Sequence, residues 1–369
     1  MKVICDGLAL TEAINKVIKA LPVKKNFTVL ECVKLSAYDN QITLTCTDTE
    51  LTIIKTISAD VRIEGDILIP GKFFSDFTRK LDNESISLES INENKKLIIK
   101  YGENEGFINC LDVLEYPKIA TSVDGDSLVI TKKDFKEAVD RTIFSASTEE
   151  SRQILKGCLF EVTETGLNVV ALDGYRMAVC TKPYVSATAT DKRFVVPARS
   201  LNEIVKLISL DDENITVKFT QDKIFVEIDS TVIISRLLKG EFVKYKNIIP
   251  SDHTTVVTID RKVFLGSIDR ATVISKQSRN NMVKMDIKAD VITIDSNSEQ
   301  GNMREQFSAS AEGKENIICF NGKYLMDFLT VIDDDFIQMM IKASNSPCVF
   351  KQLDKEESLF LVLPMRITT

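Results

Sequence analysis

Few residues of this sequence have the types and the spacing that catalysis requires. The single histidine, His253, stands in the polar stretch PSDHTT, where a solvated side chain is the expected state. The stretch GDILIPGKF at 65–73 approaches a phosphate-binding loop, but it has one residue too many between its glycines, and Phe73 stands where Ser or Thr would bind magnesium. The motifs HExxH, GxSxG and GxGxxG do not occur. We therefore predict a protein that is not an enzyme and uses no cofactor.

Side chains that could hold a metal are present but poorly grouped. Asp333, Asp334 and Asp335 are consecutive, yet LDNESISL and LDDENITV stand at corresponding places earlier in the chain, which indicates a turn before a strand. The cysteines are widely scattered, without a CxxC pair: Cys5, Cys32, Cys46, Cys110, Cys158, Cys180, Cys319 and Cys348. We expect buried thiols in a reducing compartment and no metal site.

The length and composition indicate a globular protein of more than one domain. A chain of 369 residues is too long for one ordinary domain, and its 44% hydrophobic and 27% charged residues suit packed cores. No stretch approaches the ~18 consecutive apolar residues of a membrane-spanning helix, and the start MKVICDGLALTE lacks the pattern of a signal peptide. We therefore expect a cytoplasmic protein with no membrane partner.

The chain contains the same helical pattern three times. The segments are IPGKFFSDFTRKL at 69–81, VPARSLNEIVKLI at 196–208 and FNGKYLMDFLTVI at 320–332. Each has a base, an apolar residue and an acid at matching places, and its apolar residues recur at i, i+3 and i+7, which predicts an amphipathic helix. An acidic turn and a β-rich run follow each segment. This order of features indicates three copies of one unit.

Each copy also has an earlier helix and a region of alternating strands. The earlier helices are expected at 13–21, 135–146 and 264–275, and strands with one buried face at 34–56, 159–181 and 285–307. We predict an α+β fold of three repeated domains, each with two helices packed on antiparallel sheet. The domains are expected to cover residues 1–125, 126–252 and 253–369.

Positive charge is concentrated in the predicted helices, although the formal net charge is −7. The helices and adjoining loops, taken as 12–25, 72–81, 132–156, 198–208, 260–284 and 322–332, hold 22 Lys and Arg against 11 Asp and Glu. The remainder holds 25 bases against 43 acids. Ordinary solvated helix faces would account for this division. So would helices that line one side of an arc and attract phosphate there.

The end of the chain, LVLPMRITT at 361–369, is unusually apolar for a terminus. Two interpretations stay open on the residues alone. The run is either a final edge strand packed on a core, or a segment that lines a site.

Four stretches together resemble the bacterial sliding clamp, the β subunit of DNA polymerase III. They are ALDGYRMAV at 171–179, GEFVKYKNIIP at 240–250, FNGKYLMDFL at 320–329 and LVLPMRI at 361–367. Each alone is a weak signal, because DG before aromatic and basic residues is also a good hairpin turn. The resemblance runs end to end, in length, order and three-domain organisation.

The resemblance implies three DNA-clamp domains that form half of a closed ring, completed by a head-to-tail homodimer. Such a ring encircles duplex DNA regardless of sequence, slides along it and tethers the replicative DNA polymerase as a processivity factor in DNA replication. A separate ATP-dependent clamp loader complex opens and loads it. Other replication and repair proteins bind through short apolar peptide motifs. A peptide-binding scaffold that does not encircle DNA is the alternative.

The resemblance also assigns the tail to a peptide-binding groove between the second and third domains. Carried over position by position, the groove comprises Leu155, Leu172, Gly174, Tyr175, Arg176, Met177, Val243, Ile248, Asn321, Tyr324, Val362, Leu363, Pro364, Met365 and Arg366. Methionines and aliphatic residues accept varied leucine or phenylalanine anchors. Arg176 and Arg366 are expected to donate hydrogen bonds at the rim.

Several groove positions depart from the family pattern. Leu172 stands where a threonine is usual, Tyr175 replaces a common histidine, Val243 replaces a proline, and Asn247 replaces a frequent basic residue. These changes alter the shape of the groove and lower the positive charge at its edge, so its preferred motif is left open.

Two further sets of residues follow from the resemblance. The DNA-binding positions are Lys24, Lys25, Lys72, Arg152, Lys156, Arg199, Lys276 and Arg279. The apolar contacts across the dimer junction are Phe107, Val273 and Ile274, for which ordinary core packing is the alternative. Gln153 and Ile154 occupy places where related clamps sometimes have aromatic DNA contacts, so direct contact with DNA is expected to be weaker.

Overall fold

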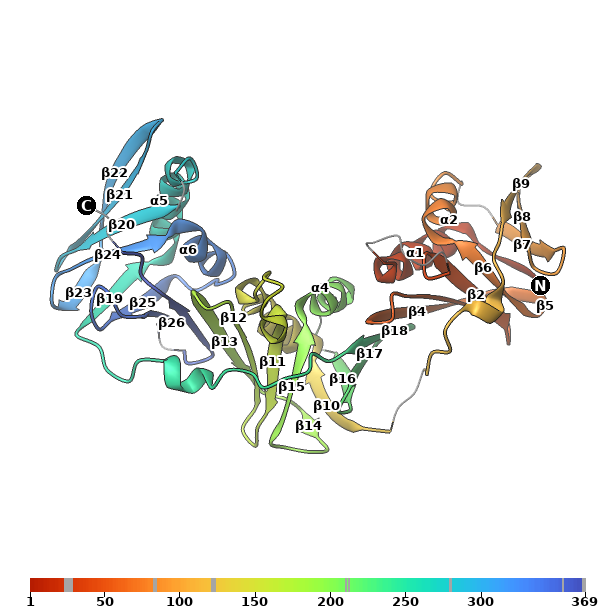
Figure 1. Ribbon diagram of the computed structural model, residues 1–369, viewed down its shortest axis with the longest axis horizontal. Coiled ribbons are helices and arrows are strands. Elements are labelled where there is room, and N and C mark those ends of the chain that lie inside the picture. Colours follow the sequence, from red (N-terminus) through yellow and green to blue (C-terminus); the bar gives the residue numbers. More distant parts are fainter. Residues whose placement is uncertain are drawn as a thin grey trace. The chain divides into compact units, whose positions relative to one another are not determined.

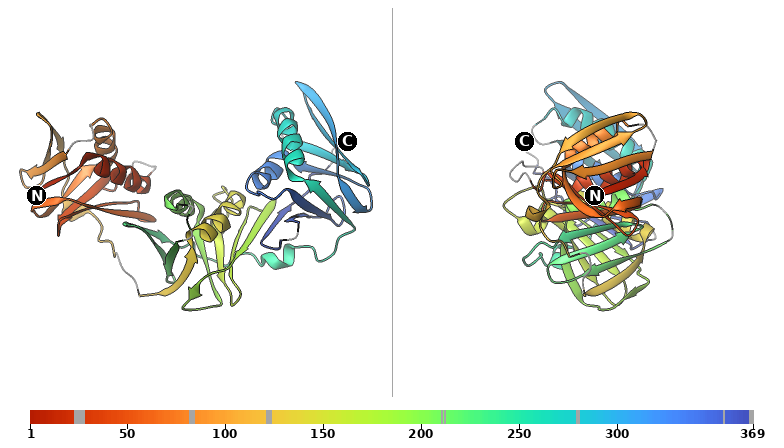
Figure 2. Two further views of the ribbon diagram at one scale, coloured as in Figure 1. Left: turned by 180° about the vertical axis from the view of Figure 1, so that it is seen from behind. Right: turned by 90° about the vertical axis from the view of Figure 1, so that its right-hand side faces the viewer.

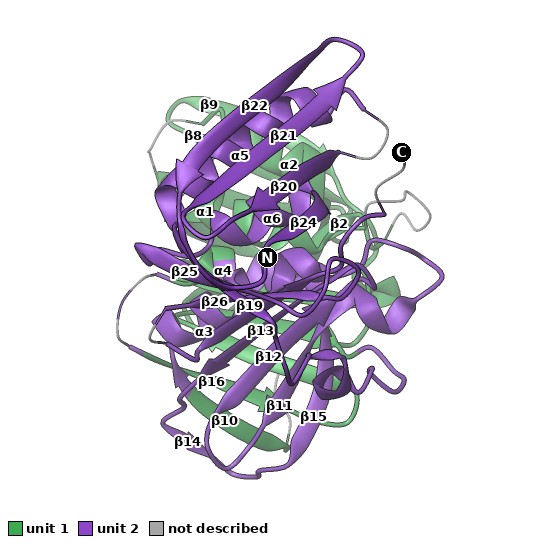
Figure 3. Cartoon of the chain, turned by 90° about the vertical axis from the view of Figure 1, so that its left-hand side faces the viewer, with its two compact units in different colours: residues 1–129, 206–208, 214–237 green, residues 130–205, 209–213, 238–369 purple. Residues whose placement is uncertain are grey.

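The computed structural model describes residues 1–22, 29–81, 85–120, 124–209, 211, 213–278, 281–353 and 355–366. The chain divides into two compact units (Figure 3). Unit 1 comprises residues 1–129, 206–208 and 214–237, and unit 2 comprises residues 130–205, 209–213 and 238–369. Each unit therefore contains one outer repeat of the sequence and part of the middle one.

Unit 1 has two sheets with helices packed on them (Figure 1). One sheet has the order β5-β1-β7-β8-β9, and in the other β10, β16, β17, β18, β4, β3, β2 and β6 are successive neighbours. The strands are β1 (Lys2–Asp6), β2 (Cys32–Tyr38), β3 (Gln41–Thr47), β4 (Leu51–Ser58), β5 (Asp60–Ile63), β6 (Gly65–Pro70), β7 (Ser85–Ile91), β8 (Lys96–Tyr101), β9 (Asn104–Asn109), β10 (Asp126–Thr131), β16 (Asn214–Phe219), β17 (Lys223–Ile228) and β18 (Thr231–Arg236). The helices are α1 (Gly7–Val17) and α2 (Gly71–Thr78), with short 3-10 turns at Ile18–Ala20 and Val113–Glu115.

Unit 2 also has two antiparallel sheets. One has the order β15-β11-β12-β13-β27-β26-β25-β19-β23, and the other β22-β21-β20-β24. The strands are β11 (Gly157–Val162), β12 (Leu167–Leu172), β13 (Arg176–Lys182), β14 (Ser186–Ala187), β15 (Lys192–Pro197), β19 (Thr255–Asp260), β20 (Met282–Ile287), β21 (Val291–Ser298), β22 (Gly301–Ser308), β23 (Ser310–Gly313), β24 (Asn316–Asn321), β25 (Phe336–Ile341), β26 (Cys348–Gln352) and β27 (Ser358–Val362). The helices are α3 (Lys132–Asp140), α4 (Ala198–Leu207), α5 (Arg261–Ser275) and α6 (Gly322–Leu329), with 3-10 turns at Ile143–Ser145, Gln153–Lys156 and Tyr245–Ile248.

The core of the third repeat shows why these residues form these elements. Helices α5 and α6 lie against the sheet β22-β21-β20-β24 (Figure 2). Alternate residues of β20, such as Val283 and Met285, are fully buried, as period-two strands with one covered face require. Phe264 of α5 and Phe328 of α6 belong to the same core cluster. The side chain of Asp260 caps α5 by accepting a hydrogen bond from the Val263 N–H at 2.9 Å.

The six predicted helices are all present, with shifted ends. The helix expected at 13–21 begins at Gly7, because the Asp6 carboxylate accepts a hydrogen bond from the Ala9 N–H and caps it. The helix expected at 135–146 begins at Lys132 and ends at Asp140. A separate 3-10 turn follows at Ile143–Ser145. The three regions of alternating strands are confirmed as β2–β4, β11–β13 and β20–β22. The α+β prediction is correct.

The structure also describes the cysteines, the three consecutive aspartates and the lengths of the helices. All eight cysteines are free, and seven of them are buried. Asp333, Asp334 and Asp335 lie between α6 and β25, and none of the described residues forms a cluster that could hold a metal ion. None of the described helices is long and apolar enough to span a membrane.

Candidate partner-binding groove

The last strand, β27, is an inner strand, so the expectation of a final edge strand is wrong. It pairs with β13 on one side, with Val362 opposite Arg176, and with β26 on the other. Phe360 and Leu361 are nearly fully buried, on opposite faces of the strand. Because β27 has a neighbouring strand on each side, both rows of its backbone groups are paired, and both of its faces are covered as well.

Beyond β27 the chain leaves the sheet but stays attached to its surroundings. The Leu363 N–H donates to the Tyr175 carbonyl at 2.8 Å, and the Met365 N–H donates to the Cys319 carbonyl at 2.7 Å. Leu363, Pro364 and Met365 are half-buried, while Arg366 is exposed. The tail therefore runs from the turn after β12 to the end of β24.

An apolar cluster supports the tail from the side of the second repeat. Leu155, Leu172 and Met177 are buried in it together with Leu361, and half-buried Leu363 packs against it. Antiparallel pairing places Leu172, at the end of β12, opposite Met177, at the start of β13, and Leu155 comes from the 3-10 turn Gln153–Lys156. The sequence-predicted groove residues thus include both a buried floor and an exposed rim.

The turn between β12 and β13 has a fixed conformation. The Asp173 carboxylate accepts hydrogen bonds from the N–H groups of Tyr175 at 2.8 Å and Arg176 at 3.0 Å. Gly174 has a φ of +97°, a region that disfavours other residues, and a Cβ there would come within 2.9 Å of an Arg152 guanidinium nitrogen. Glycine therefore allows Arg152, predicted as a DNA contact, to lie beside the groove.

Two tyrosines form the exposed aromatic part of the groove. The rings of Tyr175 and Tyr324 are stacked, with centroids 6.5 Å apart. Tyr175 is 57% exposed and therefore available to a partner, whereas Tyr324, on α6, is half-buried. Burial and the nearby Asp173 carboxylate raise the pKa of Tyr324 above its usual range, so its hydroxyl stays neutral at physiological pH.

Arg176 does not supply hydrogen bonds at the rim, contrary to expectation. It is only 9% exposed, and its three nitrogens donate to the Asp173 carboxylate at 3.0 Å, to the Asp327 carboxylate and to the Phe144 carbonyl at 2.6 Å. Its guanidinium carbon also lies 4.5 Å from the Tyr324 ring centroid. Arg176 therefore joins β13, α6 and the turn after α3, and it holds the groove in shape.

Replacing Arg176 by alanine is expected to destabilise unit 2 by about 3 kcal/mol, because the substitution leaves the partly buried Asp173 carboxylate without its cation and the Asp327 carboxylate with Lys323 alone. Chemical denaturation followed by circular dichroism would measure the change. The matched control is Arg304→Ala, whose guanidinium is exposed and lies 3.5 Å from the half-buried Asp295, so its loss should cost less than about 1 kcal/mol. Equal effects of the two substitutions would show that the Arg176 contacts contribute no more than a surface ion pair.

The remaining groove positions lie at the rim or take structural roles. Val243 is 40% exposed and Ile248 is 38% exposed, and both flank residues of the apolar cluster. The Asn321 side chain caps α6 by accepting a hydrogen bond from the Lys323 N–H. Asn321 is therefore engaged by its own helix, and the exposed apolar residues are the ones free to contact a partner.

Sequence reasoning missed the residues that hold Arg176 in place. Asp173 was visible in the DGYR turn, and Asp327 was the acid repeated in each helix, but neither was assigned to the site. The Phe144 carbonyl carried no sequence signal, because any residue has a carbonyl group.

The predicted DNA and dimer positions that the structure describes differ in exposure. Lys24, Lys25 and Arg279 lie outside the described residues. Lys72, Arg152, Arg199 and Lys276 are exposed, whereas Lys156 is half-buried and paired with Glu150. Phe107 is 59% exposed and Val273 is 62% exposed, while Ile274 is half-buried. Core packing therefore does not describe Phe107 or Val273.

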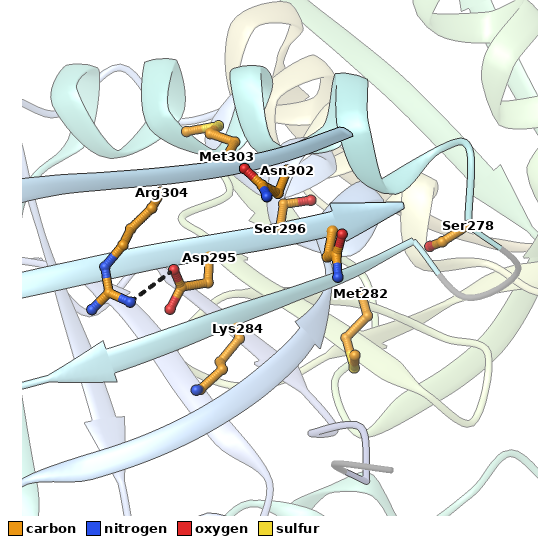
Figure 4. A pocket seen from close by; sticks show the side chains of 9 residues that line it. Ser278, Met282, Lys284, Asp295, Ser296, Asn302, Met303 and Arg304 are labelled. Atoms are coloured by element: carbon orange, nitrogen blue, oxygen red, sulfur yellow. Dashed lines mark ion pairs between the residues drawn. The ribbon is translucent and has the colours of Figure 1, made fainter. Parts of the chain in front are cut away.

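A separate cavity of about 580 Å³ lies on the sheet β22-β21-β20-β24 (Figure 4). Lys284, Asp295 and Arg304 stand opposite one another on adjacent strands, and an Arg304 nitrogen lies 3.5 Å from the Asp295 carboxylate. They share the face opposite the buried Val283. This cavity contains none of the predicted site residues, and its charges form a cross-strand ladder.

Family models for a three-domain protein match this chain in order. They describe the N-terminal, central and C-terminal domains of the DNA polymerase III beta subunit, and they match residues 1–120, 129–244 and 246–366. The chain belongs to the DNA polymerase III beta subunit family. Its repeats are the three clamp domains of that family. Our boundaries at 125 and 252 stay predictions.

Individual relatives of the family match over nearly the whole chain. The Beta sliding clamp of Staphylococcus aureus strain Mu50 is 29% identical over 363 residues, covering 96% of each chain. The crystal structure of a putative DNA polymerase III beta subunit from Eubacterium rectale has a TM-score of 0.94 at 31% identity and 99% coverage of both chains. The DNA polymerase sliding clamp of Bacillus subtilis has a TM-score of 0.96 at 28% identity, with full coverage of both chains.

Proposed function

We propose that this protein is a DNA polymerase processivity factor that works as a ring-shaped homodimer around duplex DNA. The observation that carries the proposal is the match of all three clamp-domain models, in order, along the chain. In this role the protein slides along DNA, tethers the replicative polymerase and is loaded by a separate clamp loader complex. It works in the cytoplasm, binds by shape and charge, and catalyses no reaction.

An open sheet edge in each of the two units supports head-to-tail ring closure. Strand β9 is the last strand of its sheet, and β22 is the last strand of another. Such edges offer unpaired backbone groups to another strand. Phe107 lies on β9 and Val273 on α5, and both expose most of their side chains. In our proposal the β9 edge of one protomer meets the β22 edge of its partner, a heterologous contact that closes after two copies.

DNA binding in this proposal depends on topology more than on affinity. Lys72, Arg152, Arg199 and Lys276 are exposed cations that could contact phosphate without reading sequence. The net charge of −7 opposes tight binding to a polyanion. A closed ring resolves this conflict, because it keeps DNA without holding it tightly.

Partner proteins bind the tail groove in this proposal. The exposed rim residues Tyr175, Val243 and Ile248 lie beside the apolar cluster under Leu363. A leucine or phenylalanine side chain would gain affinity by covering this surface. The replicative polymerase, the clamp loader complex and other replication and repair proteins with short apolar motifs are the proposed partners.

Site-specific cross-linking tests ring closure. The variant Phe107→Cys with Val273→Cys, treated with a short bis-maleimide, should give a covalently closed dimer. Seven of the eight native cysteines are buried and Cys110 is half-buried, so wild-type protein is the background control. Size measurement in solution should give a dimer before treatment. A monomer with no cross-linked product would instead support the alternative, a peptide-binding scaffold that does not encircle DNA.

A further inference from the structure

A second cavity, in unit 1, lies beside the start of α2. Its volume is about 350 Å³, near the lower end of the ~300–1,000 Å³ typical of ligand pockets. It is lined by Glu31, Cys32, Pro70, Gly71, Lys72, Phe73, Asp76 and Leu111. Phe73 is 57% exposed, which is unusual for a large aromatic side chain at a cavity. The cavity has room for one or two apolar side chains.

The backbone around this cavity repeats the backbone at the third-domain side of the tail groove. The Gly71 N–H donates to the Glu31 carbonyl at 3.0 Å, and at the matching place the Gly322 N–H donates to the Asn281 carbonyl at 2.9 Å. Cys32 pairs with Pro70 as Met282 pairs with Asn321. The cavity therefore stands at the same position in the first repeat as the groove does in the third.

The chain segment that lies beside each site, at Leu111 in the first repeat and at Met365 in the third, is held by a matching hydrogen bond. The Leu111 N–H donates to the Leu68 carbonyl at 2.9 Å, and the Met365 N–H donates to the Cys319 carbonyl at 2.7 Å. Leu68 and Cys319 both lie two residues before the last residue of their strand, β6 and β24. Leu111 is thus the first-repeat counterpart of Met365 in the tail.

The lining residues match in type across the two sites. The helix starts Gly71-Lys72-Phe73 and Gly322-Lys323-Tyr324 place a glycine, a cation and an aromatic ring at the same three positions. The aromatic ring of Phe73 is more exposed than the half-buried Tyr324, which is covered by Tyr175 and Arg176. Phe73 therefore has apolar surface left for an incoming side chain.

One difference in charge distinguishes the two sites. Lys323 is paired with Asp327 at 2.8 Å, but in the first repeat Asp76 lies 3.7 Å from Arg79 instead. Within the described residues Lys72 forms no ion pair, so its ammonium group is available to a carboxylate of a partner.

We propose that this cavity is a second docking site for partner peptides, which takes a leucine or phenylalanine side chain beside Phe73 and an adjacent carboxylate at Lys72. The proposal rests on the proposed function, since it gives the first domain the same class of partner as the tail groove. Each protomer would then hold two peptides at once.

Binding stoichiometry tests the proposal directly. The probe is a fluorescein-labelled pentapeptide Gly-Leu-Asp-Phe-Gly, measured by equilibrium dialysis against the full-length protein. Wild type should bind two peptides per protomer. The tail variant, which carries Met365→Ala and lacks residues 366–369, should bind one. Adding Phe73→Ala should weaken this remaining site by at least ~10-fold, about 1.4 kcal/mol.

Two controls distinguish binding in the cavity from nonspecific binding to exposed apolar surface. Phe336→Ala removes another exposed aromatic side chain, 46% exposed on β25, and should leave both sites unchanged. The matched peptide Gly-Leu-Asn-Phe-Gly should bind the tail variant more weakly than the aspartate peptide, and Lys72→Gln should remove that difference.

The possible failures are distinguishable. If wild type binds one peptide and the tail variant none, the second site is wrong and the tail groove stands. If the tail variant keeps two sites and Phe73→Ala weakens one of them, or if Phe73→Ala alone removes all binding, the tail groove is wrong and the cavity stands. A remaining site that ignores both Phe73→Ala and Lys72→Gln would overturn the second site.

Discussion

Affinity for leucine- and phenylalanine-bearing partner peptides should fall by at least ~30-fold, about 2 kcal/mol, when Met365 is replaced by alanine and residues 366–369 are removed. Met365 is half-buried in the tail, and its side chain is a flexible apolar group that can adapt to a partner side chain. The Leu363 N–H bond to the Tyr175 carbonyl remains in this variant, so the floor of the groove should keep its shape. Fluorescence anisotropy with a labelled peptide would measure the loss.

Two controls make this result specific to the groove. Met326→Ala removes a half-buried methionine of α6 that packs on the core of the third domain, and it should leave peptide affinity unchanged. Sedimentation should show the same oligomeric state for wild type and the tail variant. Unchanged peptide affinity in the tail variant would mean that the groove has been placed on the wrong residues, and a change of oligomeric state would give the tail a role in assembly.

The exposed tyrosine of the groove should affect which peptides bind. The Tyr175 ring is stacked on the ring of Tyr324 and is 57% exposed. A flat aromatic surface favours partner side chains that can stack on it. The buried Leu172 adds an apolar side chain to the floor of the groove.

The helices and the alternating strands could be predicted from the sequence because their signals are local. The apolar spacing in 69–81, 196–208 and 320–332 places a buried face on α2, α4 and α6, and all three helices form there. The glycine of the DGYR turn likewise reports a local need for positive φ, which Gly174 has.

The pairing between repeats could not be predicted from the same signals. Strand β4 pairs with β18, with Ile53 opposite Ile233, and β13 pairs with β27, with Ala178 opposite Phe360. These contacts join strands about 180 residues apart in sequence. The sequence pattern of an apolar strand is the same at the edge of a sheet and inside it, so β27 could not be recognised as an inner strand.

The role of Arg176 depends equally on distant parts of the chain. Its partner Asp327 is 151 residues away, and its third contact is the backbone carbonyl of Phe144. Resemblance to a family assigned Arg176 to the groove but could not tell that its donors are used within the protein. Burial and partners decide that question, and both are properties of the fold.

Retention on DNA tests the central claim that this protein acts as a closed ring. Protein loaded onto a nicked circular plasmid by a clamp loader complex would be separated from free protein by gel filtration, before and after a restriction enzyme linearises the plasmid. A ring should stay on the circle and leave once the DNA has ends, because it is held by topology and not by tight contacts. Equal loss from circular and linear DNA, or equal retention on both, would contradict the account.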